Sequence, residues 1–108
     1  MPRSIRVLYA GVKGRVRRNF NWAPINKKSA VIVTAAEFDL APSGIFGNAI
    51  FGRPNLGAAN VYVTNVGPHD PEGGHGGVEF HLHVDWASPL DVMVTISVLD
   101  DVEDFARG

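Results

Sequence analysis

The 108-residue chain contains no cysteine, which excludes a disulfide framework and any chemistry of a thiol. It also has no apolar run near the ~20 residues that a membrane-spanning helix needs. Its first residues soon alternate between apolar and charged side chains, so the apolar stretch of a secretory signal is missing. We therefore expect a cytoplasmic protein without a transmembrane segment.

Acidic residues are missing from the first third of the chain, although the net charge of the whole is only −1. Residues 1–36 carry eight cations and no acid, a charge of +8. Residues 37–108 carry all 11 acids and two cations, a charge of −9. Three interpretations are open: an anion-binding face, head-to-tail pairing between copies, or neutralisation between strands of one fold. Opposite charges on neighbouring strands are common in sheets, which favours the last.

A helical period is hard to find, whereas a period of two runs through most of the chain. One long strand is predicted over residues 8–16, with its apolar face on the even positions and an increasingly basic odd face. Gly11 and Gly14 mark a bulge or a bend in this strand. Phe20 and Trp22 continue the even face, so both are predicted to lie in the core.

Further strands are predicted at residues 29–38, 59–66, 78–86 and 92–99, with a loop rich in glycine and proline at residues 67–77. The last two strands alternate most strictly and are predicted to form a pair at the centre of the domain, over residues 78–99. The uncharged segment 44–52 is expected to pack rather than to be exposed. These elements predict one all-β domain over residues 1–108, an antiparallel β-sandwich that is immunoglobulin-like or jelly-roll-like, with a small barrel as the alternative. Residues 100–108 are expected to form a flexible acidic tail.

The polar residues of the 78–86 strand form the clearest candidate site. Four of them share one face at a spacing of ~7 Å, because successive residues of a strand point to opposite sides: Glu79, His81, His83 and Asp85. Imidazole and carboxylate groups bind divalent transition metals such as zinc, which is therefore the candidate cofactor. The preceding loop adds His69 and His75 as candidate ligands. The alternative is that these polar residues form only the solvated face of a half-exposed strand.

A second candidate site is the basic stretch near the N-terminus. Its candidate anion-binding residues are Lys13, Arg15, Arg17 and Arg18. Cations interleaved with exposed aromatic rings are typical of proteins that bind single-stranded nucleic acid. Because the nearby rings are predicted to be buried and the whole chain is slightly acidic, nucleic acid is not the partner that we expect.

Catalytic motifs are missing: the chain has neither a Gly-x-Ser-x-Gly elbow nor a phosphate-binding glycine loop with its lysine. No catalytic residue is assigned. The leading hypothesis is a non-enzymatic binding or assembly module that self-associates, as a homo-oligomer or with a protein partner. The first alternative is a metal-binding protein, or a small metal-dependent enzyme, that uses the Glu79/His81/His83/Asp85 face. The second is binding of an anionic polymer by the basic strand.

Overall fold

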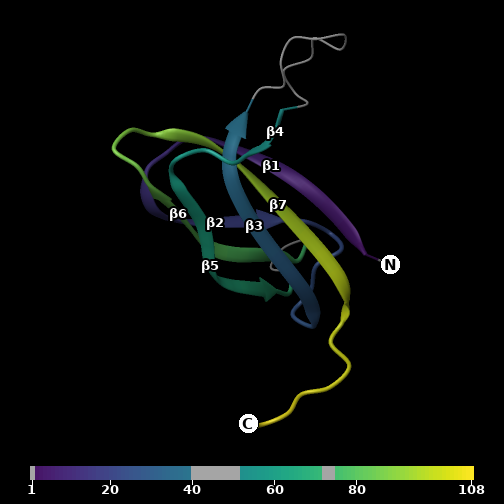
Figure 1. Ribbon diagram of the computed structural model, residues 1–108. Coiled ribbons are helices and arrows are strands. Elements are labelled where there is room, and N and C mark those ends of the chain that lie inside the picture. The colour runs from purple at the N-terminus through teal and green to yellow at the C-terminus, as the bar shows by residue number, and fades with distance from the viewer. Residues whose placement is uncertain (1, 40–51, 72–74) are drawn as a thin grey trace.

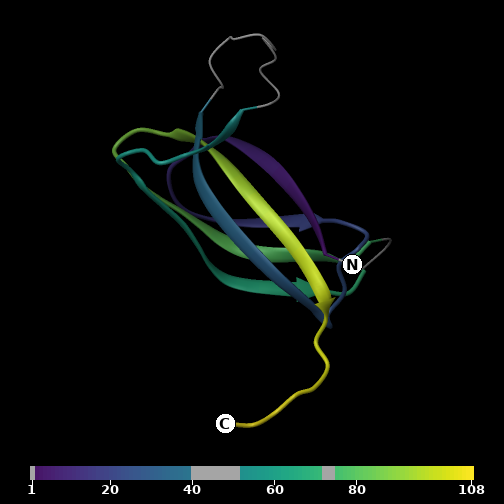
Figure 2. The same cartoon turned by 45° about the vertical axis from the view of Figure 1, so that its right-hand side comes forward.

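Residues 2–39, 52–71 and 75–108 are described by the computed structural model. Within these ranges the chain forms seven strands: β1 (Arg3–Val12), β2 (Gly14–Asn21), β3 (Ser29–Asp39), β4 (Arg53–Asn55), β5 (Asn60–His69), β6 (Gly77–Asp85) and β7 (Leu90–Asp101). Sheet A has the strand order β1-β7-β3-β4 and sheet B the order β2-β6-β5, with all neighbours antiparallel. The two sheets lie as crossed layers (Figure 1; Figure 2). The predicted all-β, antiparallel architecture is confirmed. Among the described residues there is no helix long and apolar enough to cross a membrane.

Strands β6 and β7 are central, as their alternation predicts, but they belong to different sheets. Strand β6 lies between β2 and β5, and β7 lies between β1 and β3. Their inward side chains make up most of the buried core cluster: Val78, Phe80, Leu82, Val84, Val92, Val94, Ile96 and Val98. Full burial of one such side chain contributes about 1.5–3 kcal/mol, so these two strands supply most of the hydrophobic stabilisation of the fold.

The prediction of one strand over residues 8–16 is wrong, because the chain turns a corner there and divides into β1 and β2. Gly11 and Gly14 have φ angles of 63° and 71°, in the left-handed region that glycine enters without a steric penalty. The pairing register of β1 with β7 also shifts between Tyr9 and Val12. The backbone nitrogen of Gly11 donates a hydrogen bond of 3.0 Å to Oδ1 of Asp91, which ties the corner to β7.

The corner changes which face of β1 is buried. Its odd residues Ile5, Val7 and Tyr9 pack against the core. Leu8, which the even pattern placed inside, is 49 % exposed. Beyond the corner the even pattern holds, and Phe20 packs against the core as predicted.

Two strand boundaries differ from the prediction, and one predicted segment lies almost entirely outside the described residues. Strand β5 continues to His69, three residues beyond its predicted end, and Pro68 is tolerated because β5 is an edge strand. Strand β7 extends to Asp101, and residues 102–108 are exposed without regular structure. The segment predicted to pack, residues 44–52, lies outside the described residues except for Gly52.

Strands β1 and β2 are edge strands on the same side of the sandwich, and two cation–π contacts bridge them. The guanidinium carbon of Arg18 on β2 lies 5.3 Å from the ring centroid of Tyr9 on β1. That of Arg3 on β1 lies 5.4 Å from the ring of Trp22, just beyond β2. Burial raises the pKa of the Tyr9 hydroxyl, and the charge of Arg18 lowers it in part.

Replacing Gly14 by alanine should lower the free energy of unfolding by about 1–2 kcal/mol, because a side chain is strained at positive φ. Gly14→Asn should cost less, since asparagine tolerates this region better. Urea unfolding measures both. Gly67→Ala is the matched control, because a Cβ atom there would also have no neighbour within 4 Å and no positive φ opposes it. Equal stability of wild type and Gly14→Ala would contradict the proposed role of the corner.

Tyr9 should make the fold sensitive to alkaline pH. Its folded pKa is raised above the unfolded value of 10.0, so the folded state favours the neutral phenol. The contribution of Tyr9 to the free energy of unfolding is complete below pH 10 and is lost as the pH rises through the folded pKa. We expect Tyr9→Phe, which cannot ionise, to lose less stability than wild type between pH 8 and about pH 10.5 in urea unfolding. Tyr62→Phe, on sheet B, serves as the control. Parallel losses in wild type and Tyr9→Phe would count against this account.

Candidate functional site: the outer face of sheet B and its basic edge

The outer face of sheet B gathers both groups of residues that the sequence singled out. In the register of β2 with β6, Arg15 lies opposite His83 and Arg17 opposite His81. Strand β5 lies on the other side of β6, and its outward residues complete the face. All four histidines of the chain lie on or beside this surface, which we call the histidine face: His69, His75, His81 and His83.

At one end of the histidine face, His83 is held by two neighbours on β5. Its Nε2 atom lies 2.7 Å from Oγ1 of Thr64, within hydrogen-bond distance. Its ring stacks on Tyr62 with centroids 4.4 Å apart and planes inclined by 5°. The ring of His81 meets that of His83 edge to face, at 6.3 Å and 81°. The two imidazoles are therefore neighbours, but in this arrangement they do not point at a common position.

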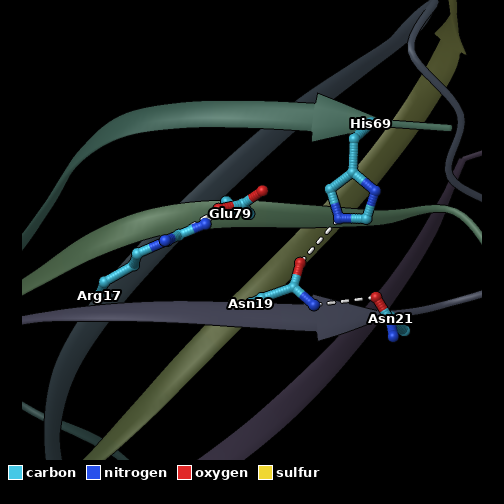
Figure 3. Close-up of polar contacts among 5 residues, drawn as sticks. All are labelled: Arg17, Asn19, Asn21, His69 and Glu79. Carbon is cyan, nitrogen blue, oxygen red and sulfur yellow. Dashed lines mark hydrogen bonds and ion pairs between the residues drawn. The ribbon is translucent and has the colours of Figure 1, made fainter. Parts of the chain in front are cut away.

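At the middle of the face, Arg17 and Glu79 form an ion pair across β2 and β6 (Figure 3). Both Nε and Nη2 of Arg17 donate to Oε2 of Glu79, and the Nε bond is 2.9 Å long. Both side chains remain partly exposed, so the pair adds little to stability, about 0–1 kcal/mol. The main consequence of this ion pair is electrostatic, because it neutralises one cation of the basic strand.

At the other end, a chain of hydrogen bonds runs from β5 to the end of β2 (Figure 3). Nε2 of His69 lies 2.7 Å from Oδ1 of Asn19. The amide nitrogen of Asn19 donates to Oδ1 of Asn21 at 2.9 Å. The second ring nitrogen of His69 lies 2.9 Å from the carbonyl oxygen of Asp70, so this imidazole lies between two acceptor oxygens.

Beside this chain lies a surface depression of about 320 Å³. Its lining residues are Arg17, Asn19, Asn21, His69, His75 and Glu79. Sequence reasoning missed the two asparagines, although they share the parity of Arg15 and Arg17 on β2. That parity is the signal that could have found them. Tyr62 and Thr64 were missed for a different reason, because their places beside His83 depend on how β5 pairs with β6.

The structure divides the six predicted metal ligands into separate groups. His69, His75 and Glu79 line the depression, whereas His81 and His83 lie further along β6. Asp85, at the end of β6, is exposed and lies opposite Asn60. In the ranges that the structure describes, no group of three histidine or acidic side chains is placed to hold a metal ion. Zinc binding stays a prediction that needs a direct test.

The four predicted anion-binding residues are also divided. Arg15 and Arg17 point outward on β2, and Lys13 is exposed at the corner. Arg18 points inward, toward Tyr9, and its Nε atom is buried without a hydrogen-bond partner among the described residues. Of the cations in residues 1–36, those that form ion pairs within the described parts of the chain are Arg17, with Glu79, and Lys27, with Asp70.

Comparison of the chain with protein-family models, with curated proteins and with solved structures gives no match.

Zinc binding by the predicted ligands should raise the melting temperature. A ligand at a hundredfold excess over its Kd stabilises the folded state by about 2.7 kcal/mol. If His81 and His83 bind zinc, His81→Ala combined with His83→Ala should abolish the rise, whereas His69→Ala combined with His75→Ala should not. Thermal unfolding of untagged protein with and without zinc measures this. A wild-type melting temperature that zinc leaves unchanged would contradict the metal hypothesis.

Proposed function

We propose that this domain is a non-enzymatic binding and assembly module, in which the basic edge of one copy binds the acidic C-terminal segment of another. The basic edge consists of β1, the corner and β2, with the cations Arg3, Arg6, Lys13, Arg15, Arg17 and Arg18. The C-terminal segment is residues 102–108. The observation that carries the proposal is that five of the ten cations of the chain lie on these two edge strands and a sixth, Lys13, lies at the corner between them.

Two features of the basic edge favour a partner. An edge strand presents backbone N–H and C=O groups that can pair with another strand. Among the described residues, no strand pairs with the outer side of β1 or of β2. Four of the six cations are exposed and have no ion pair within the described part of the chain: Arg3, Arg6, Lys13 and Arg15. These cations attract an acidic strand, repel a basic one and gain no charge attraction from a neutral one, so the edge favours an acidic chain.

The C-terminal segment has the complementary chemistry. It carries the acids Glu103 and Asp104 against the single cation Arg107, and it follows directly on Asp101. Val102 is 55 % and Phe105 84 % exposed, so each offers apolar surface that contact with a partner would bury. The backbone nitrogen of Val102 donates to the carbonyl of Lys28 at 2.9 Å, which fixes where the segment leaves the domain.

A second copy is the occupant that the geometry favours. The segment leaves on the β3 side of β7, whereas the basic edge lies on the β1 side. It also leads away from both sheets (Figure 1; Figure 2). A single-stranded nucleic acid is less favoured, because Phe20 and Trp22 pack against the core and are not free for bases to stack on.

Light scattering coupled to size-exclusion chromatography tests the proposal. In about 20 mM salt we expect a mass above the monomer, which falls to the monomer in about 500 mM salt as the charges are screened. Lys13→Glu with Arg15→Glu should give monomers at low salt, and so should Glu103→Lys with Asp104→Lys. Mixing these two variants should restore association, because each retains one native surface and the reversed surfaces also match.

Lys27→Glu with Arg53→Glu is the matched control, since it reverses two cations away from the basic edge. Each belongs to an exposed ion pair worth about 0–1 kcal/mol, so the fold should persist and the mass at low salt should stay above the monomer. The proposal is wrong if wild type is strictly monomeric at low salt. It is also wrong if the edge variant assembles as wild type does.

A further inference from the structure

The depression on the histidine face has a chemistry that the assembly proposal does not use. Its volume of about 320 Å³ is at the lower end of the range for small-molecule sites, ~300–1,000 Å³. All its lining residues are polar or charged, which makes it unsuited to an apolar ligand. The ligand is therefore a polar one, which its free hydrogen-bonding groups select.

The net charge of the lining excludes a strongly charged ligand as the best fit. Arg17 and Glu79 neutralise each other, because two nitrogens of the guanidinium donate to the same carboxylate oxygen. An anion would meet the carboxylate of Glu79, and a cation would meet the guanidinium of Arg17. A neutral ligand avoids both repulsions.

The groups left free alternate between donors and acceptors. The ion pair engages Nε and Nη2 of Arg17 and Oε2 of Glu79, which leaves Nη1 as a donor and Oε1 as an acceptor. The amide nitrogen of Asn21 and the ring of His75 have no hydrogen-bond partner among the described residues. His69 and Asn19 are already hydrogen-bonded to each other. They therefore form part of the wall of the depression and are not counted among its free hydrogen-bonding groups.

We propose that this depression binds a neutral polyhydroxylated ligand, that is, a carbohydrate, through neighbouring hydroxyl groups. A hydroxyl both donates and accepts, so two adjacent hydroxyls match the adjacent acceptor of Glu79 and donor of Arg17. Further hydroxyls reach the amide nitrogen of Asn21 and the ring of His75. Because the depression is open to solvent, its hydrogen bonds replace bonds to water, and affinity for a single sugar is about millimolar.

The test is a titration followed by backbone amide NMR shifts, with glucose, galactose and N-acetylglucosamine at up to about 100 mM, about a hundredfold above the expected Kd. It is run in about 500 mM salt, where the proposed self-association is suppressed, so that each proposal can fail alone. At least one sugar should give saturable shifts at residues 17–21, 69 and 75–79. Glu79→Gln, which removes the charged acceptor, should weaken that binding about tenfold or more. Asn21→Ala gives a second, independent loss if Glu79→Gln folds poorly.

His81→Ala, on the same strand but outside the depression, is the matched control and should bind as wild type does. Sulfate tests the alternative that the depression binds an anion. Wild type should show no sulfate shifts at these residues, and Glu79→Gln should gain them, because Arg17 is then unneutralised. The proposal is overturned if none of the three sugars shifts these residues, or if sulfate binds wild type there and Glu79→Gln does not change the sugar result.

Discussion

The corner at Gly11–Gly14 is the constraint on which the rest of the molecule depends. Two positive φ angles and a shifted register carry the chain out of sheet A and into sheet B, and Asp91 anchors the turn to β7. Without this corner, β1 and β2 would continue as one strand in one sheet. Because of it, both become edge strands on one side of the sandwich, and the cations of the N-terminal region are brought together there.

The fold was predictable wherever period two runs without interruption. Val78 to Val84 and Val92 to Val98 are buried at every second position, as their alternation indicates. Prediction failed at Leu8. Two glycines with positive φ and a shift in register change which alternate positions face the core, so odd residues are buried before the corner and even residues after it. It also failed at Pro68, where an edge position tolerates a residue that usually ends a strand. Both failures arise from local backbone geometry, which a pattern of apolar residues does not record.

The candidate site was predictable only along one strand at a time. Glu79, His81 and His83 were grouped because they share a face of β6. That Arg17 pairs with Glu79, and that Thr64 meets His83, depends on registers between segments far apart in the chain. Those contacts change the chemistry, since one neutralises a cation and the other engages a ring nitrogen. The interpretation of the face therefore moved from a row of metal ligands toward a charge-balanced, hydrogen-bonding surface.

We propose two surfaces on this topology, which share Arg17: a basic edge that binds an acidic segment of another copy, and a charge-balanced polar depression that binds a small hydroxylated ligand. The central claim is that the opposite charges of the two halves meet between copies. Hydrogen exchange of the backbone amides of β2 tests it most directly. The account predicts that residues 14–21 exchange more slowly at low salt than at high salt, and that replacing Glu103 and Asp104 by lysine removes the difference. Equal exchange at both salt concentrations, in a protein that remains folded, would contradict it.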